Sequence, residues 1–148
     1  MLLSGTNNVG NRLPPGGIDA AVEDVTSGLR AVVRLMQSKA PNAAIILMGI
    51  FPRNGNMGVM PEIDRINANL ANLADGRRIR YLNINSRLAD SGGRLHDGMM
   101  NASDQLHPTL KGYQVWADAL KPIPTELLGP PAKEDHAPAP TGDPSAKR

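Results

Sequence analysis

The sequence predicts an α/β sandwich built around a parallel β-sheet. Segments with the apolar spacing of amphipathic helices alternate along the chain with short apolar segments of the kind found in buried strands. The resulting order of strand, helix, strand, helix, strand, loop and helix is that of repeated right-handed β-α-β units. A length of 148 residues suits a single domain with one core.

The first half of the chain supplies two strands and a helix. Residues 1–4 are mostly apolar and run directly into the turn-prone sequence GTNN. In residues 17–39 the apolar side chains recur every three or four positions, which places them on one helical face, and the sequence KAPN ends that helix. Residues 43–51 form a continuous apolar run between two prolines, as expected for a parallel strand covered on both faces, although periodicity alone would also allow a buried helix.

The next part of the chain adds a second helix and a third strand. Pro61 and Glu62 are typical of a helix start, and Asp75-Gly76 is typical of its end. Residues 78–85 then alternate polar and apolar side chains, which indicates a strand.

The last part supplies one more helix and a tail. After a glycine-rich loop at residues 91–98, Thr109 can cap a helix that Pro122 and Pro124 are expected to close. Residues 129–148 have no large apolar side chain and are rich in proline, alanine and charge, so we expect a disordered tail.

The composition excludes several kinds of site and partner. The chain has no cysteine, which rules out disulfides, thiolate metal sites and a thiol nucleophile. Its 16 basic residues exceed its 14 acidic residues by only two and are scattered, so nucleic acid is not an expected partner. The longest apolar run is about half as long as a membrane-spanning helix, and residues 1–5 do not form a secretory signal. His96 and His136 lack metal-ligand spacing, so we expect neither a metal nor a cofactor.

One pair of residues has the chemistry of a catalytic dyad. Asp104 stands three positions before His107, and a catalytic imidazole needs an acceptor on one ring nitrogen to fix its tautomer. A tight turn could bring this carboxylate back to Nδ1, and Pro108 restricts His107 to non-helical angles. The alternative is that Asp104 only caps the loop and His107 is a surface residue.

The sequence GTNN is a second candidate. At the carboxyl end of a parallel strand, a glycine followed by asparagine can aim a side-chain N–H at a developing oxyanion. An ordinary asparagine-rich turn explains the same four residues. Both candidates fall where such sheets bind ligands, at the carboxyl ends of strands.

Together these blocks resemble a known family. LLSGTNNVG, AAIILMGIFPRN, INANLANLADGRRIRYLNIN and SDQLHPTLKGYQVWADAL look like the third, middle and last blocks of the SGNH (GDSL-type) hydrolases. The most similar group contains the platelet-activating-factor acetylhydrolase catalytic subunits and related bacterial acetyl esterases. The resemblance covers residues 1–128, which would form the carboxyl-terminal portion of such a domain, with residues 129–148 as the tail.

The resemblance implies a fold and a set of roles. The fold would be a three-layer α/β/α sandwich of flavodoxin-like type with strand order 2-1-3-4-5, of which this chain holds strands 3, 4 and 5. Asn7 would donate to the oxyanion from a turn that Gly5 permits, His107 would be the general base and acid, and Asp104 would orient it. The other candidates for the substrate and oxyanion region are Thr6, Asn8, Phe51 and Arg53. A place in the core is the simpler explanation for Phe51, and a solvated loop explains Arg53 equally well. Asn8 stands where many family members have aspartate.

The nucleophile is the main departure from the family pattern. The family's serine and its oxyanion glycine lie in two blocks before the GTNN strand, so we expect them upstream of Met1 and expect this chain to be inactive alone. The chain's own serines do not lie on a strand-to-helix turn and are interpreted as structural; they include Ser4, Ser86, Ser91 and Ser103. The missing strands would leave an open sheet edge through which copies could self-associate.

The expected partner is a small acyl ester, and an acetylated sugar, a phospholipid and a simple ester all fit. Two other functions stay open at this point. The chain could be a non-catalytic module that binds through the half-open site, or a flavodoxin-like domain that binds a nucleotide, although no glycine-rich phosphate loop follows a strand. The compartment is unknown, because a targeting sequence would also lie upstream.

Overall fold

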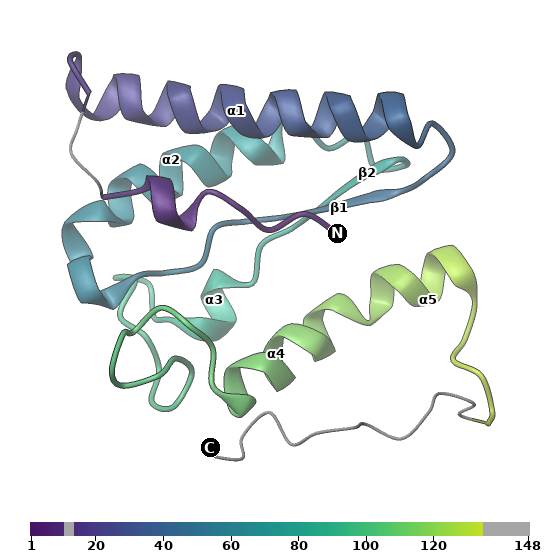
Figure 1. The fold of residues 1–148 in the computed structure, drawn as a ribbon. Helices are drawn as coiled ribbons and strands as arrows, with labels where there is room; N and C mark the ends of the chain where they lie inside the picture. Colours follow the sequence, from purple (N-terminus) through teal and green to yellow (C-terminus); the bar gives the residue numbers. More distant parts are fainter. Residues whose placement is uncertain (11–13, 135–148) are drawn as a thin grey trace, which may run out of the picture.

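The centre of the molecule is a small parallel sheet (Figure 1). The computed structural model describes residues 1–10 and 14–134. Strands β1 (Ile45–Met48) and β2 (Ile79–Leu82) are parallel, with Ile45 opposite Ile79 and Met48 opposite Leu82. Leu2 pairs with the other side of β1, since its N–H donates to the carbonyl of Ile46 (2.8 Å) and its carbonyl accepts from the N–H of Met48 (2.9 Å).

All three predicted strands are shorter in the structure than in the prediction. The segment at residues 1–4 is reduced to one bridge at Leu2, because Gly5 turns the chain with a left-handed φ of 104°. The run at residues 43–51 keeps strand pairing only in β1. Beyond it, the backbone of Ile50 bonds to the side chain of Asn67 instead of to a neighbouring strand.

Helices cover both faces of this sheet (Figure 1). Helices α1 (Gly17–Lys39) and α2 (Met60–Ala71) pack on one face and against each other. Helix α4 (Leu110–Leu120) lies on the other face and is followed by α5 (Pro122–Leu128), while the short α3 (Asn85–Leu88) follows β2. Two 3-10 segments complete the described elements, η1 (Thr6–Asn8) and η2 (Asn54–Val59).

The side chains of β1 alternate between two cores, as the period of a strand requires. Ile45 and Leu47 join the core under α1 and α2, whereas Ile46 and Met48 join the core under α4. The three-layer α/β/α arrangement predicted from the sequence is therefore confirmed.

The helix predictions are confirmed with two corrections. The second helix was predicted to end at Asp75-Gly76, but α2 ends at Ala71, and Oδ1 of Asp75 instead accepts the N–H groups of residues 77–79 where the chain enters β2. The helix predicted at residues 17–39 has those bounds, Pro61 lies in the first turn of α2, and Thr109 caps α4 by accepting the N–H of Gly112 (3.2 Å). Pro122 and Pro124 do not close the helical region, because α4 ends at Leu120 and α5 begins at Pro122. Proline has no backbone N–H, but the N–H groups in the first turn of a helix have no partner within the helix. Proline can therefore start a helix, as Pro122 does in α5.

The end of the chain is described only in part. Residues 129–134 carry no helix or strand, and the rest of the tail predicted at residues 129–148 lies outside the described residues. Within the described part, no helix is long and apolar enough to cross a membrane.

Candidate active site

A cleft of about 430 Å³ opens at the carboxyl end of the sheet, beside the start of α4. Its walls are residues 3–8, Phe51, residues 106–108, and Tyr113 and Trp116 of α4. The structure thus brings the GTNN turn and His107, which are about a hundred positions apart in the sequence, into one cavity. From the sequence, both groups were expected at the carboxyl ends of strands, where such sheets bind ligands.

Asp104 binds both the imidazole and the backbone of His107. Its Oδ2 lies 2.9 Å from Nδ1 of His107, while its Oδ1 accepts the N–H groups of Leu106 (2.9 Å) and His107 (3.0 Å). Gln105 makes the turn possible with a φ of 50°. Local capping and pairing with the imidazole, which the sequence left as alternatives, therefore occur together.

The same contacts hold Asp104 in its ionised form. The backbone N–H of His107 has the largest effect, followed by the imidazole of His107 and the N–H of Leu106, and together they lower the pKa of Asp104 to about 2. The carboxylate is consequently an anion that accepts only, and it selects the tautomer of His107 with the proton on Nδ1.

The backbone of His107 is held between two segments. The carbonyl of His107 accepts the N–H of Asn101 (2.8 Å), and the N–H of Thr109 donates to the carbonyl of Met99 (3.0 Å). Helix α4 comes so close to this pairing that a Cβ on Gly112 would lie 2.1 Å from the carbonyl oxygen of Met99. Only glycine fits at this position, so Gly112 sets how near α4 stands to the histidine.

The GTNN sequence forms a tight turn that faces the cleft. Gly5 is buried, and its left-handed φ favours glycine; a Cβ there would also lie 2.9 Å from Cδ1 of Ile50, which would have to shift. The N–H of Asn8 donates to the carbonyl of Gly5 (2.9 Å) and closes the turn. Thr6, Asn7 and Asn8, which the resemblance assigned to the oxyanion region, line the cleft.

The remaining two candidates lie in different places. Phe51 forms part of the cleft wall and is only 5% exposed; its ring meets Trp116 edge-on, with centroids 5.1 Å apart. Arg53 is not part of that wall. Its Nη1 donates to the carbonyls of Thr6 (3.2 Å) and Val9 (2.7 Å), so Arg53 binds the backbone of the turn and does not line the cleft.

Two aromatic side chains of α4 were not among the predicted site residues. The chain has one phenylalanine, one tryptophan and two tyrosines, and three of these four side chains line the cleft: Phe51, Tyr113 and Trp116. Tyr113 stacks on Trp116 with centroids 5.9 Å apart. The signal that could have found them is that aromatic residues are scarce in this chain, while two of its four, Tyr113 and Trp116, follow His107 within ten positions.

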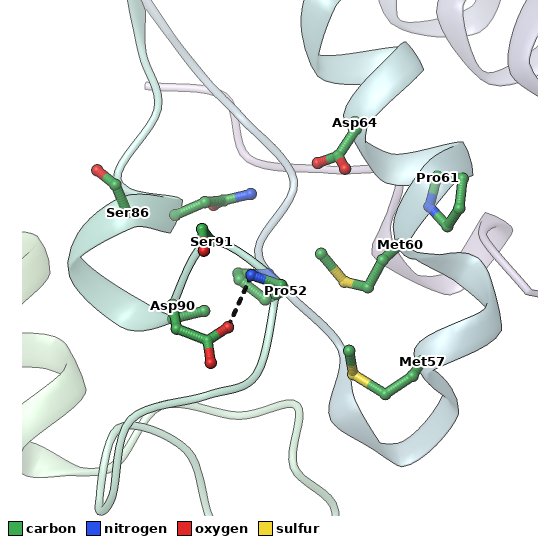
Figure 2. Close-up of a pocket in the computed structure, with 12 residues that line it drawn as sticks. Pro52, Met57, Met60, Pro61, Asp64, Ser86, Asp90 and Ser91 are labelled. Carbon is green, nitrogen blue, oxygen red and sulfur yellow. Dashed lines mark hydrogen bonds between the residues drawn. The ribbon is translucent and has the colours of Figure 1, made fainter.

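A second cleft of about 450 Å³ lies between the start of α2 and the loop that follows α3. Figure 2 shows Met57 and Met60 on one side of it and Ser86, Asp90 and Ser91 on the other. Oδ1 of Asp90 accepts the N–H groups of Gly92 and Arg94, both at 2.9 Å. Among the described residues no group of three or more histidine, aspartate or glutamate side chains could hold a metal ion.

The fold and the cleft define a class of protein: an α/β/α domain with an aspartate-oriented histidine and an asparagine-bearing turn at the carboxyl end of its parallel sheet. The chain belongs to the GDSL-like lipase/acylhydrolase family, whose model matches residues 1–115. The resemblance seen in the sequence is thereby confirmed.

Curated relatives and solved structures agree with this membership. The chain is 29% identical over 143 residues to platelet-activating factor acetylhydrolase IB subunit alpha1 of Bos taurus, covering 95% of this chain and 56% of that protein. It is 30% identical over 127 residues to the Homo sapiens subunit, covering 84% of this chain and 50% of that protein. The chain thus spans about half the length of the curated relatives it matches.

Two solved structures share the fold. A Streptococcus pneumonia protein named for a platelet activating factor matches with a TM-score of 0.66 and 25% identity, over 82% of this chain and 57% of that one. A Bacteroides fragilis protein assigned as an acylhydrolase matches with a TM-score of 0.59 and 22% identity, over 72% of this chain and 53% of that one. The second likeness supports the fold alone.

Proposed function

We propose that this chain forms the acid–base part of an ester-hydrolysing site, with a serine nucleophile supplied by a segment outside it. The observation that carries the proposal is the 2.9 Å contact between Asp104 Oδ2 and His107 Nδ1, in a cleft that also contains Asn7. Residues 1–128 would be the carboxyl-terminal portion of the whole hydrolase domain. The coverage of only about half of each relative supports this assignment.

The geometry supports the following chemistry. Because Asp104 fixes the proton on Nδ1, Nε2 of His107 carries the lone pair that accepts the serine proton as the serine oxygen attacks the ester carbonyl. The tetrahedral intermediate collapses when the protonated Nε2 gives that proton to the leaving alkoxide, which departs as the alcohol. His107 then takes a proton from water, whose oxygen attacks the acyl-enzyme, and returns it to the serine.

Asn7 is proposed to stabilise the negative charge on the carbonyl oxygen in both steps. It lies in the turn that lines the cleft beside His107, and the N–H of a side-chain amide can donate to an oxyanion. Gly5 and Asn8 close that turn through the 2.9 Å hydrogen bond between them. Losing one such donor typically lowers kcat by about 100- to 1000-fold.

The substrate is proposed to be a small acyl ester. The curated relatives are named platelet-activating factor acetylhydrolase subunits. In this chain, Phe51, Tyr113 and Trp116 give the cleft an apolar wall that suits an acyl group or the adjoining part of the alcohol. A panel of acetylated sugar, phospholipid and simple acetyl ester would separate the three substrate types.

Ester hydrolysis and fluorophosphonate labelling test the proposal directly. Both are measured on this chain and on the same chain joined to the residues its gene encodes upstream. We expect labelling and turnover only in the longer protein, and we expect His107→Ala to lower its kcat about a million-fold, as in other triads. Absence of hydrolysis in the longer protein, across the whole panel, would refute the function.

Ser4 provides the control for the position of the nucleophile. It is the serine that shares the cleft wall with His107 among the described residues. Labelling of the shorter chain that disappears in Ser4→Ala would show that the chain carries its own nucleophile. Labelling that is absent from the shorter chain, and that survives Ser4→Ala in the longer one, supports a nucleophile outside residues 1–148.

Binding without catalysis is a second candidate function, and one observation favours it. Tyr113 and Leu110 on α4 are 51% and 86% exposed, so apolar surface lies open beside the cleft. Pairing of a second copy along the Leu2 edge of the sheet is the proposed mode of self-association. Sedimentation of this chain at several concentrations distinguishes a monomer from a self-associated form. A monomer at all concentrations would exclude self-association.

A further inference from the structure

The segment after β1, residues 51–54, contacts both sides of the cleft. Phe51 meets Trp116 of α4, and Arg53 holds the turn that contains Asn7. We propose that Arg53 is a positioning residue, whose guanidinium fixes the place of Asn7 relative to His107. This inference rests on the proposed function and adds to it a residue that does not touch the substrate.

The hydrogen bonds of Arg53 lie at the two ends of the turn. Segment η1 is a single 3-10 turn, and such turns are less stable than α-helical ones. Its ends are joined by one hydrogen bond, from the N–H of Asn8 to the carbonyl of Gly5. The carbonyls of Thr6 and Val9, at either end of the turn, both accept from Nη1 of Arg53, at 3.2 Å and 2.7 Å.

The charge of Arg53 strengthens these two bonds. Carbonyl oxygens carry partial negative charge, and a charged guanidinium donates to them more strongly than a neutral group does. None of the ion pairs formed between described residues involves Arg53. Its guanidinium is therefore directed at the turn and not at a carboxylate.

The backbone on both sides of Arg53 is fixed, which allows it to act as a rigid brace. Asn67 binds the N–H and the carbonyl of Ile50 at 2.7 Å and 2.9 Å. On the other side, Oδ1 of Asn54 accepts the N–H of Leu95 (2.7 Å) and its Nδ2 donates to the carbonyl of Gly93 (2.8 Å). The guanidinium of Arg53 therefore donates to the carbonyls of Thr6 and Val9 from a segment that is hydrogen-bonded on both sides.

Native-state hydrogen exchange on the full chain tests the brace without any need for activity. We compare Arg53→Met, Arg53→Lys and Arg65→Met, the last being a matched control because Arg65 is a half-exposed arginine on α2 that pairs with Asp19 at 2.7 Å. Arg53→Met should speed exchange of the Asn8 N–H by at least about tenfold, the effect of losing a charge-assisted hydrogen bond. Amides of β1 and β2 should exchange at unchanged rates.

Chemical rescue and kinetics separate positioning from a general structural role. Added guanidinium, below the concentrations that unfold proteins, should slow the exchange of the Asn8 N–H in Arg53→Met but not in Arg65→Met. In the longer, active protein, Arg53→Met should lower kcat about 10- to 100-fold, with KM and the pH profile unchanged, and Arg53→Lys should fall between it and the wild type.

The exchange measurements test the positioning role of Arg53, and ester hydrolysis by the longer protein tests the proposed function. Equal exchange of the Asn8 N–H in wild type and Arg53→Met, or an equal slowing by guanidinium in both arginine variants, would overturn the positioning role. If the exchange results hold but the longer protein hydrolyses no ester, the brace stands and the proposed function fails.

Discussion

Nδ1 of His107 lies 2.9 Å from Oδ2 of Asp104, and the other oxygen of the same carboxylate accepts the backbone N–H of His107 at 3.0 Å. One carboxylate thus fixes both the ring and the main chain of the histidine. Because Pro108 follows and Asn101 binds the carbonyl of His107, the imidazole has a defined orientation although its side chain is 69% exposed.

Asp104→Asn should reverse the tautomer of His107. In the variant, the amide oxygen of residue 104 is expected to accept the N–H groups of Leu106 and His107, so that the amide NH₂ group faces Nδ1 of His107. Nδ1 must then accept a hydrogen bond, and the ring proton moves to Nε2. The ¹⁵N shifts of the His107 ring report the change on this chain, and kcat of the longer protein should fall about 10,000-fold. Asp97→Asn, a nearby exposed carboxyl, is the control; an unchanged tautomer in Asp104→Asn would contradict the prediction.

The Asp104–His107 contact should survive to unusually low pH. The pKa of Asp104 in the folded chain, about 2, lies below its ordinary value of 3.8, so the folded state binds this proton less readily than the unfolded state. The associated stability is present above pH 3.8 and is lost as the pH falls through 2. The ¹³Cγ shift of Asp104 should titrate near 2 in the folded chain, and a midpoint near 3.8 there would refute this reading.

The helices were largely predictable, because helix periodicity and capping depend on residues that are close together in the sequence. The apolar period of residues 17–39 specified α1 to the residue, and the cap at Thr109 followed from its side-chain chemistry. The lengths of the strands were not predictable, since they depend on distant partners. The side chain of Asn67, a residue of α2, binds the backbone of Ile50. No local sequence pattern shows that a polar side chain, and not a neighbouring strand, will pair with that backbone.

In the candidate site, too, the short-range contacts were predictable and the long-range contact was not. The spacing of Asp104 and His107 suggested their contact, and Gly5 suggested the turn before Asn7, because both relations lie within a few residues. The position of Arg53 behind the turn depends on the packing of two segments more than forty residues apart. From the sequence, a contact with substrate and a position in a solvated loop explained Arg53 equally well.

Asn67→Leu should destabilise the fold by about 1–3 kcal/mol, the usual cost of an unpaired buried N–H. Asn67 is only 4% exposed, and its loss leaves the N–H of Ile50 without a partner, whereas the carbonyl of Ile50 keeps the Nδ2 of Asn85 at 2.9 Å. Asn72→Leu, at the exposed end of α2, is the matched control and should change the free energy of unfolding by less than about 0.5 kcal/mol. Urea denaturation of both variants measures the difference, and equal midpoints would contradict the role of Asn67.

Gly112→Ala should destabilise the chain, although alanine normally favours a helix. The new Cβ would lie 2.1 Å from the carbonyl oxygen of Met99 and 3.1 Å from Cβ of Pro108, so α4 must move away from the segment that holds His107. Such overpacking costs about 1–3 kcal/mol, which exceeds the helical preference of alanine over glycine of about 1 kcal/mol.

Gly28→Ala isolates that helical preference, because a Cβ at Gly28, inside α1, has no atom within 4 Å. It should raise the free energy of unfolding by about 0.5–1 kcal/mol, while Gly112→Ala lowers it. The ¹⁵N shifts of the His107 ring should change only in Gly112→Ala, since only that substitution moves the helix beside the histidine. A stabilising effect of both alanines would show that α4 can yield without disturbing the Met99 carbonyl, and that its close approach is not what positions His107.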